Sequence, residues 1–148
     1  MKKILLILFL ILAIIPKIVF AFEPPDPNRW YWAGSDEKIG VWIDKQTLVA
    51  SKENNANSSC FNHRYVTSWE MWYNSQDKTT ILCNSIYDLD CRKRKDLSAI
   101  TYDEFGRAIN SVIPASPIFL PIPPDTWGEG LLNLMIEFWN YQNKGQSI

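Results

Sequence analysis

The sequence predicts an α+β domain: an antiparallel sheet of about six strands, followed by one C-terminal helix that packs on one face of the sheet. Segments rich in β-branched and aromatic residues occur between residues 29 and 113, and short polar turns separate them. After residue 124 the hydrophobic period lengthens from two residues to between three and four. A helix that follows a sheet in this way must lie on a sheet face to bury its apolar stripe.

The first 21 residues have the composition of a cleaved secretory signal peptide. Two lysines precede an apolar run from Ile4 to Ile15, and small residues suited to a signal peptidase follow at 19–21. A retained membrane anchor is the alternative, which Pro16 and Lys17 disfavour because they interrupt a stretch already short for a membrane span. We therefore expect an exported protein of the periplasm, cell envelope or cell surface, with no membrane span after cleavage.

The rest of the chain has the size of one domain and an acidic balance. Three of the 15 basic residues and none of the 16 acidic ones lie in the signal segment, so residues 22–148 have a net charge of −4. This charge argues against nucleic acid as a partner, because phosphate binding needs a basic face. We divide the chain into a signal peptide (1–21), a proline-rich lead-in (22–28), one domain (29–143) and a tail (144–148).

The first strands form a predicted hairpin. Residues 29–34 and 38–44 flank a polar turn at 35–37, and apolar residues alternate in the second arm. Residues 52–59 (KENNANSS) are too polar to be buried, so we expect a loop there.

A longer hairpin is predicted from residues 63–74 and 79–91 around the polar turn at 75–78. If residues 73 and 80 face each other, paired residue numbers sum to about 153. Arg64 then lies near Asp88 to Asp90, and Cys60 lies near Cys91 to Lys93.

A third hairpin, a connection and the helix complete the prediction. Residues 97–113 turn at 103–106, where Gly106 suits a positive φ. A proline-interrupted extended connection follows at 114–124. Thr126 and Glu129 have the spacing of a helical capping box. The apolar face of the helix would comprise Leu131, Met135, Phe138 and Gln142, with Leu132 and Trp139 beside them, and we expect a stop near Lys144 and Gly145.

Candidate catalytic residues are few. His63 is the only histidine, so a histidine–cysteine hydrolase would have to use one of the three cysteines as nucleophile. No nucleophile motif surrounds them, and thiols of exported proteins are mostly oxidised, which predicts one disulfide and one remaining thiol. We therefore predict no enzyme, no cofactor and no metal site; the lack of a C-x-x-C pair leaves zinc poorly supported.

The stretch YDLDCRKRKD (87–96) combines carboxylates, a cysteine and four basic residues. Asp88 and Asp90 would share one strand face, where they could bind a cation or divide acid and base roles. Cross-strand charge pairs with His63 and Arg64 are the alternative, which we favour. The basic run Arg92, Lys93, Arg94 and Lys95 could recognise an acidic or sulfated surface, or could be a solvated strand end that discourages aggregation.

Aromatic residues form a second candidate binding surface. The sequence places Trp30, Trp32 and Trp72 in strands that also contain tyrosines and Met71. An exposed aromatic strip would suit a protein or sugar ligand. Alternatively, both sheet faces are buried, one by the helix and the other by a partner subunit in a homodimer.

Several motifs along the chain together resemble the surface-adhesin protein E family of bacterial exported proteins. The resemblance covers about Trp30 to Trp139. It rests on Trp69 in VTSWEM, Asp90-Cys91 in YDLDC, Tyr102, Asp103 and Gly106 in TYDEFG, and Phe119, Ile122, Pro124, Thr126, Gly128 and Glu129 in FLPIPPDTWGE. It implies a sheet of about six strands with a C-terminal helix on its concave side, located at the bacterial surface. The best-known member is an adhesin that binds host extracellular-matrix and plasma proteins.

The chain departs from the family pattern in three places. Phe119 and Asp125 replace a tryptophan and a glycine. The family commonly ties its helix to the sheet through a cysteine near the position of Ile136, and this helix has no cysteine. We predict a Cys60–Cys91 disulfide instead, because the hairpin register brings these residues near each other, with Cys83 left as a thiol.

The leading functional hypothesis is an exported envelope or surface binding protein, adhesin-like, whose partners would be host extracellular-matrix or plasma proteins. A periplasmic structural or assembly module without a host ligand is the alternative, and a cysteine–histidine hydrolase is the third hypothesis.

Overall fold

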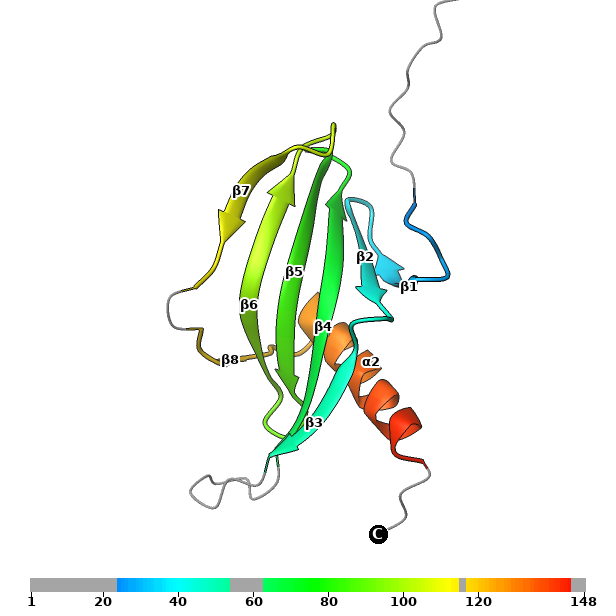
Figure 1. Ribbon diagram of the computed structural model, residues 1–148, viewed down its shortest axis with the longest axis vertical. Helices are drawn as coiled ribbons and strands as arrows, with labels where there is room; N and C mark the ends of the chain where they lie inside the picture. The colour runs from blue at the N-terminus through cyan, green and yellow to red at the C-terminus, as the bar shows by residue number, and fades with distance from the viewer. Residues whose placement is uncertain (1–23, 54–62, 115–116, 145–148) are drawn as a thin grey trace, which may run out of the picture.

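An antiparallel sheet with one helix against one of its faces forms the described part of the protein (Figure 1). The computed structural model describes residues 24–53, 63–114 and 117–144. The predicted signal peptide therefore lies outside the described residues, as does Cys60. No helix in the described ranges is long and apolar enough to cross a lipid bilayer.

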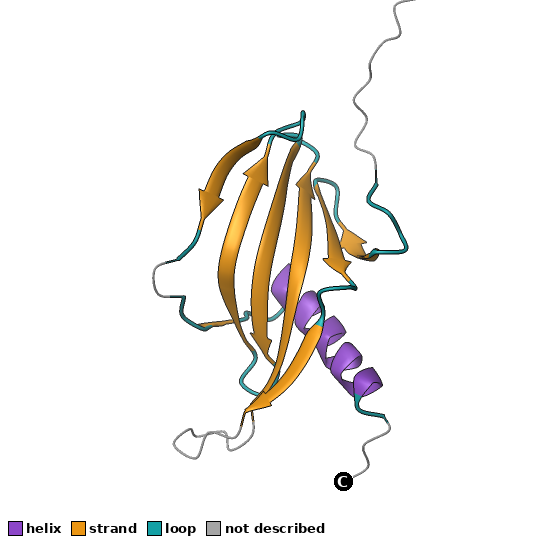
Figure 2. Ribbon diagram, viewed as in Figure 1, coloured by secondary structure: helices purple, strands orange, loops and turns teal. Residues whose placement is uncertain are grey.

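The strands follow one another along the chain until the helix at the C-terminal end (Figure 2). The sheet has the order β1-β2-β4-β5-β6-β7, β3 pairs with β4, and β8 pairs with β6. The elements are β1 (Trp30–Ser35), β2 (Ile39–Asp44), β3 (Val49–Glu53), β4 (His63–Asn74), β5 (Thr79–Asp88), β6 (Lys93–Tyr102), β7 (Ala108–Val112), β8 (Leu120–Pro121) and α2 (Trp127–Gln142). The predicted α+β class is confirmed.

The predicted hairpins are all present. In the β4–β5 pair, Tyr73 faces Thr80 and Tyr65 faces Asp88, so the predicted register is correct. The β1–β2 and β6–β7 hairpins form as expected. Gly106 has a φ of 74° in the β6–β7 turn, the conformation for which glycine was predicted there.

Strand β3 was not predicted, because its polar residues Lys52 and Glu53 were assigned to a loop. It is an edge strand with mostly exposed side chains, so it lacks the apolar alternation of a buried strand. It forms because β4 is long: β2 pairs with residues 70–74 of β4, and β3 pairs with residues 63–67. Between the two, the Thr47 hydroxyl accepts a hydrogen bond from the Trp69 backbone N–H at 3.1 Å.

The region around residues 89–97 also differs from the prediction. Strand β5 ends at Asp88 rather than at Cys91, and β6 begins at Lys93 rather than at residue 97. A tight turn joins them, in which Arg92 has a φ of 53°. The proline-interrupted connection contributes the two-residue edge strand β8, which pairs with Lys93 and Arg94 at the start of β6.

Helix α2 begins at the predicted capping box. The Thr126 hydroxyl accepts a hydrogen bond from the Glu129 backbone N–H at 3.4 Å. The Glu129 carboxylate reaches back to the backbone N–H of Asp125 rather than to that of Thr126, at 2.9 Å. The helix ends at Gln142 with Asn143 as its C-cap.

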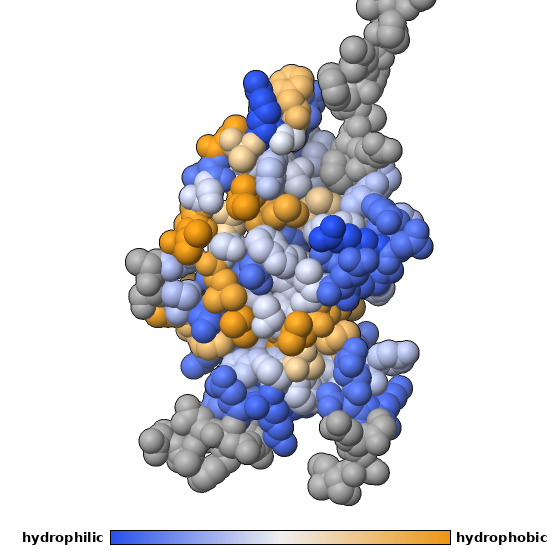
Figure 3. Space-filling model, viewed as in Figure 1, coloured by the Kyte–Doolittle hydropathy of each residue, from blue (hydrophilic) through white to orange (hydrophobic). Residues whose placement is uncertain are grey.

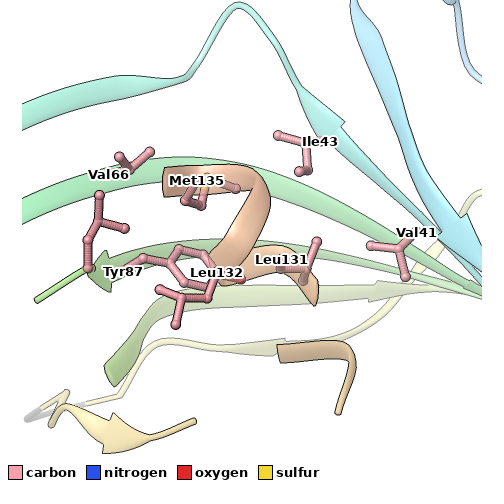
Figure 4. Packing of buried hydrophobic residues seen from close by; sticks show 8 residues of the cluster. Val41, Ile43, Val66, Tyr87, Leu131, Leu132 and Met135 are labelled. Atoms are coloured by element: carbon pink, nitrogen blue, oxygen red, sulfur yellow. The ribbon is translucent and has the colours of Figure 1, made fainter. Parts of the chain in front are cut away.

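The core lies between the helix and one half of the sheet. Leu131, Leu132 and Met135 of α2 pack against Val41 and Ile43 of β2, Val66 of β4 and Tyr87 of β5 (Figure 4). Burial of each such side chain contributes about 1.5–3 kcal/mol. In Figure 1, α2 passes behind β4, whereas β7 lies at the far edge of the sheet. The helix therefore leaves the β6–β7 side of this face uncovered.

Candidate functional site

The four basic residues at 92–95 do not form one surface. Arg92, in the turn before β6, makes an ion pair with Glu129 at the start of α2. Within β6, successive side chains point to opposite faces, so Arg94 is on the helix side and Lys93 and Lys95 are on the other. The Lys95 ammonium lies 4.6 Å from the centre of the Phe119 ring.

Arg94 is the centre of a largely buried polar network. Its guanidinium lies 3.2 Å from Glu70 of β4 and 2.7 Å from Asp96. It also lies above the rings of Trp72 and Tyr87, at 5.7 and 5.5 Å from their centres. A basic side chain predicted to be solvated is therefore held within the protein.

Glu70 is fully buried at the centre of this network. The Tyr87 hydroxyl donates to one of its oxygens at 2.5 Å, and Trp72 Nε1 donates to the other at 3.0 Å. Burial raises the pKa of the Glu70 carboxyl, and Arg94 and the two donors oppose this shift. Burial also raises the pKa of the Tyr87 hydroxyl well above its usual range. Glu70 has no solvent exposure through which a substrate could reach it, so the network ties β4, β5 and β6 together.

Cys83 belongs to the same network. Its sulfur accepts a hydrogen bond from Arg94 at 3.5 Å and lies 3.3 Å from the Ser85 hydroxyl. Burial raises the pKa of this thiol, so it is not an activated nucleophile. Cys83 has no disulfide partner among the described residues, and its predicted state as the remaining thiol stays a prediction. No disulfide joins any two cysteines of the described ranges; the predicted Cys60–Cys91 pair includes a residue outside them and stays a prediction.

The three tryptophans named as candidate ligand contacts occupy different environments. Trp72 is half-buried, and its ring meets Trp127 of α2 edge to face at 6.4 Å. Trp30 is half-buried under the Arg29 guanidinium. Trp32 is exposed on the edge strand β1, with its ring edge against Trp42 at 4.5 Å. Trp30 and Trp32, but not Trp72, line one apolar groove of about 940 Å³ together with Tyr31, Trp42, Lys45, Pro24, Pro25 and Pro27.

Apolar side chains are also exposed along the β7 edge, which sequence reasoning did not identify. They are Ile109, Val112, Ile113, Ile118 and Leu120, and we call them the β7-edge surface. The hydropathy view shows hydrophobic residues gathered along this side of the molecule (Figure 3). Every residue of β7 is exposed, although Ile109 and Val112 give it the composition of a strand that is usually half-buried.

His63 lies in a small polar cluster on the sheet face opposite the helix. Its Nδ1 is 2.7 Å from Asp88 Oδ2 and 3.9 Å from Cys91 Sγ. A hydrolytic triad needs the carboxylate at one ring nitrogen and the nucleophile at the other. Here Asp88 and Cys91 both lie at Nδ1, which is not the arrangement of a triad. The hydrolase hypothesis also named Cys60, which lies outside the described residues, and it stays a hypothesis. These three residues are, among the described ones, the group that could hold a metal ion.

The sequence located part of this cluster correctly. The predicted register placed His63 near the end of the facing strand, and Arg64 near Asp90, with which Arg64 forms an ion pair at 2.7 Å. Asp88 was assigned to the same strand face as Asp90. The turn instead directs Asp88 to His63 and Asp90 to Arg64, and that turn could not be located from the alternation of residue types.

Comparison of the chain with protein-family models, with curated proteins and with solved structures found no match. The resemblance to the surface-adhesin protein E family therefore stays a prediction.

Proposed function

We propose that this chain is an exported bacterial protein that binds a protein ligand at the cell envelope or surface, as an adhesin does. The observation that supports the proposal is the β7-edge surface, where five large apolar side chains are exposed between residues 109 and 120, in β7, in β8 and in the segment that joins them. Strands β7 and β8 both pair with β6. Apolar patches on soluble proteins usually mark interaction sites.

The position of this surface favours a protein ligand. Strand β7 pairs with β6 on one side, and within the described residues no strand pairs with its other side. Its outer backbone N–H and C=O groups can accept an additional strand from a partner, while the neighbouring apolar side chains supply the contact area. Exposed edge strands of soluble proteins are usually protected by charged residues, and β7 (AINSV) contains none.

Binding is favoured over catalysis by the chemistry of the two polar clusters. Glu70 is enclosed, and His63 presents one nitrogen to both Asp88 and Cys91. Neither cluster therefore has the arrangement of a catalytic triad, in which the carboxylate and the nucleophile lie at different ring nitrogens of the histidine.

The direct test uses purified residues 22–148 on immobilised vitronectin, laminin and plasminogen. We expect saturable binding to at least one of them, weakened about tenfold or more by Ile113→Asp, which places a charge in the apolar contact. Val49→Asp is the matched control: Val49 is an exposed apolar residue on the opposite edge strand β3, so binding should be retained. Absence of saturable binding to all three proteins would refute the adhesin proposal.

The cellular location is tested separately. Protease added to intact cells should digest the protein if it is displayed at the surface. Full protection in intact cells, and digestion after the outer membrane is opened, would favour the periplasmic structural or assembly module.

A further inference from the structure

The His63 cluster is formed by three elements that meet at one end of the β4–β5 hairpin. His63 begins β4, Asp88 ends β5, and Cys91 lies in the turn to β6. Arg64 holds this turn in place: its carbonyl accepts from the Leu89 N–H at 2.9 Å, and its own N–H donates to Asp90 at 2.8 Å. The turn therefore returns the Cys91 side chain toward His63.

The spacing of the donor atoms is close to that of a metal site. One donor atom from each of His63, Asp88 and Cys91 lies within 4.8 Å of the other two. In a tetrahedral zinc site, ordinary bond lengths place a nitrogen and a sulfur ligand about 3.6 Å apart, and a nitrogen and an oxygen about 3.3 Å apart. The observed separations are 3.9 Å for Nδ1 to Sγ and 2.7 Å for Nδ1 to Oδ2. The third separation, from the Asp88 carboxylate to Cys91 Sγ, is at most 4.8 Å, so these side chains must move by up to about 1 Å to bind one ion.

We infer that His63, Asp88 and Cys91 bind one zinc ion. Imidazole, carboxylate and thiolate are the three side-chain ligands that zinc uses in proteins. A carboxylate and a thiolate also balance the charge of a divalent cation. This site is on the face opposite the helix and does not depend on the β7-edge surface, so the inference goes beyond the proposed binding function.

Neighbouring groups hold two of the ligands in the orientation that a metal needs. Asp88 Oδ1 accepts hydrogen bonds from the backbone N–H groups of Asp90 and Cys91, at 3.2 and 3.0 Å, which leaves Oδ2 directed to His63. The His63 ring stacks on Tyr65, with 5.7 Å between ring centres and 6° between planes. Such outer contacts fix the orientation of metal ligands in known sites.

The surroundings are also suitable in burial and charge. The side chains of His63 and Asp88 are only 8% and 5% exposed, and Phe119 stacks on Tyr65 with 5.8 Å between ring centres. Two basic residues lie near the site: Arg64, whose charge is offset by Asp90, and Lys93, which faces Asp88 across the β5–β6 pair. Glu53 faces His63 across the β3–β4 pair, and water can occupy the fourth position of a tetrahedral ion.

Zinc binding has a defined proton balance. The Cys91 thiol loses its proton to solvent and forms the Zn–S bond, and the His63 hydrogen bond to Asp88 gives way to Zn–N and Zn–O bonds. Zinc binds the unprotonated nitrogen of a neutral imidazole, so Nδ1 carries no proton in the bound state. Uptake of zinc should therefore release protons and strengthen as the pH rises.

The test is a titration of reduced residues 22–148 with zinc, followed by direct analysis of the bound metal. A second titration uses cobalt as a spectroscopic probe of the same site. We expect one ion per chain and a thiolate-to-cobalt charge-transfer band. Cys91→Ser should abolish the band, and Cys91→Ser and His63→Asn should each weaken zinc binding by about tenfold or more. Circular dichroism confirms that each variant is folded.

Two matched controls separate the site from other thiols and carboxylates. Cys83→Ser removes the thiol next to Ser85 and Arg94, and Asp90→Asn removes the carboxylate next to Arg64 rather than His63. Both variants should retain zinc. Failure of the reduced native chain to bind zinc, or equal binding by Cys91→Ser, would overturn the inference.

The predicted Cys60–Cys91 disulfide is an alternative fate for the same sulfur. Mass spectrometry of protein isolated from the cell envelope without reduction distinguishes the two. Co-purified zinc with an alkylatable Cys91 supports the inference, whereas a complete Cys60–Cys91 bridge overturns it for the exported protein.

Discussion

At the scale of single residues, the burial of a charged side chain and of its partner decides its role. Arg92 and Arg94 are two positions apart in one basic run, but Arg92 pairs with Glu129 at the surface and Arg94 pairs with the fully buried Glu70. Surface ion pairs contribute little to stability, whereas a buried charge that loses its partner is costly.

This contrast predicts different effects of two similar substitutions. Arg94→Ala leaves the Glu70 carboxylate buried without its cation and should lower the free energy of unfolding by about 3–5 kcal/mol. Arg92→Ala, the matched control, should lower it by about 1 kcal/mol or less. Urea denaturation of both variants measures the difference. Equal losses would mean that the Arg94–Glu70 pair contributes no more to stability than a surface ion pair does.

At the scale of elements, one carboxylate connects the first hairpin to the helix. Asp36, in the β1–β2 turn, accepts hydrogen bonds from the backbone N–H groups of Lys38 and Ile39 at 2.7 and 2.8 Å. Its other oxygen accepts from Trp127 Nε1, at the start of α2, at 3.1 Å. The backbone hydrogen bonds, and then the bond from Trp127, lower the pKa of the Asp36 carboxyl below its ordinary value of 3.8.

The lowered pKa predicts a specific acid sensitivity. Because the folded protein holds Asp36 ionised below the unfolded pKa, this contribution to stability is complete above pH 3.8 and is lost as the pH falls through the folded pKa. Asp36→Asn should therefore show a shallower loss of stability than the native chain between about pH 5 and pH 2. Thermal unfolding across this range tests the prediction, and identical pH profiles would contradict it.

At the scale of the whole molecule, the helix covers one half of one sheet face, and the exposed apolar residues gather at the opposite edge. Leucines in these two places should therefore differ in how much they contribute to stability. Leu132 of α2 is fully buried against the sheet, whereas Leu120 of β8 is 59% exposed.

Substitution of these two leucines tests this division. Leu132→Ala should lower the free energy of unfolding by about 2–5 kcal/mol, through lost burial and the cavity that remains. Leu120→Ala should change it by about 0.5 kcal/mol or less, because the side chain is already in contact with water. Denaturant unfolding of the two variants gives the comparison. A large loss from Leu120→Ala would show that the β7-edge surface is part of the core and not a free surface.

The candidate zinc site could be predicted from the sequence only in part. The hairpin register placed His63 near Asp90 and Cys91, and this followed from two periodic segments around one turn. His63 pairs with Asp88 rather than with Asp90 because β5 ends at Asp88. The turn at 89–92, held by hydrogen bonds to the Arg64 backbone, sets this end of the strand. Element ends depend on such contacts more than on residue type, so the three-residue cluster was not predicted.

The sequence by itself determined the fold class, the three hairpins, the β4–β5 register and the capped helix. Each depends on residues close together in the chain: an apolar period, a turn residue or a cap. Only the tertiary structure decided the formation of β3 and β8, the burial of Arg94 against Glu70 and the exposure of the β7 edge. These features depend on partners distant in sequence, as in the contact between Asp36 and Trp127, 91 residues apart. Residue type does not encode which distant partner the packed chain will supply.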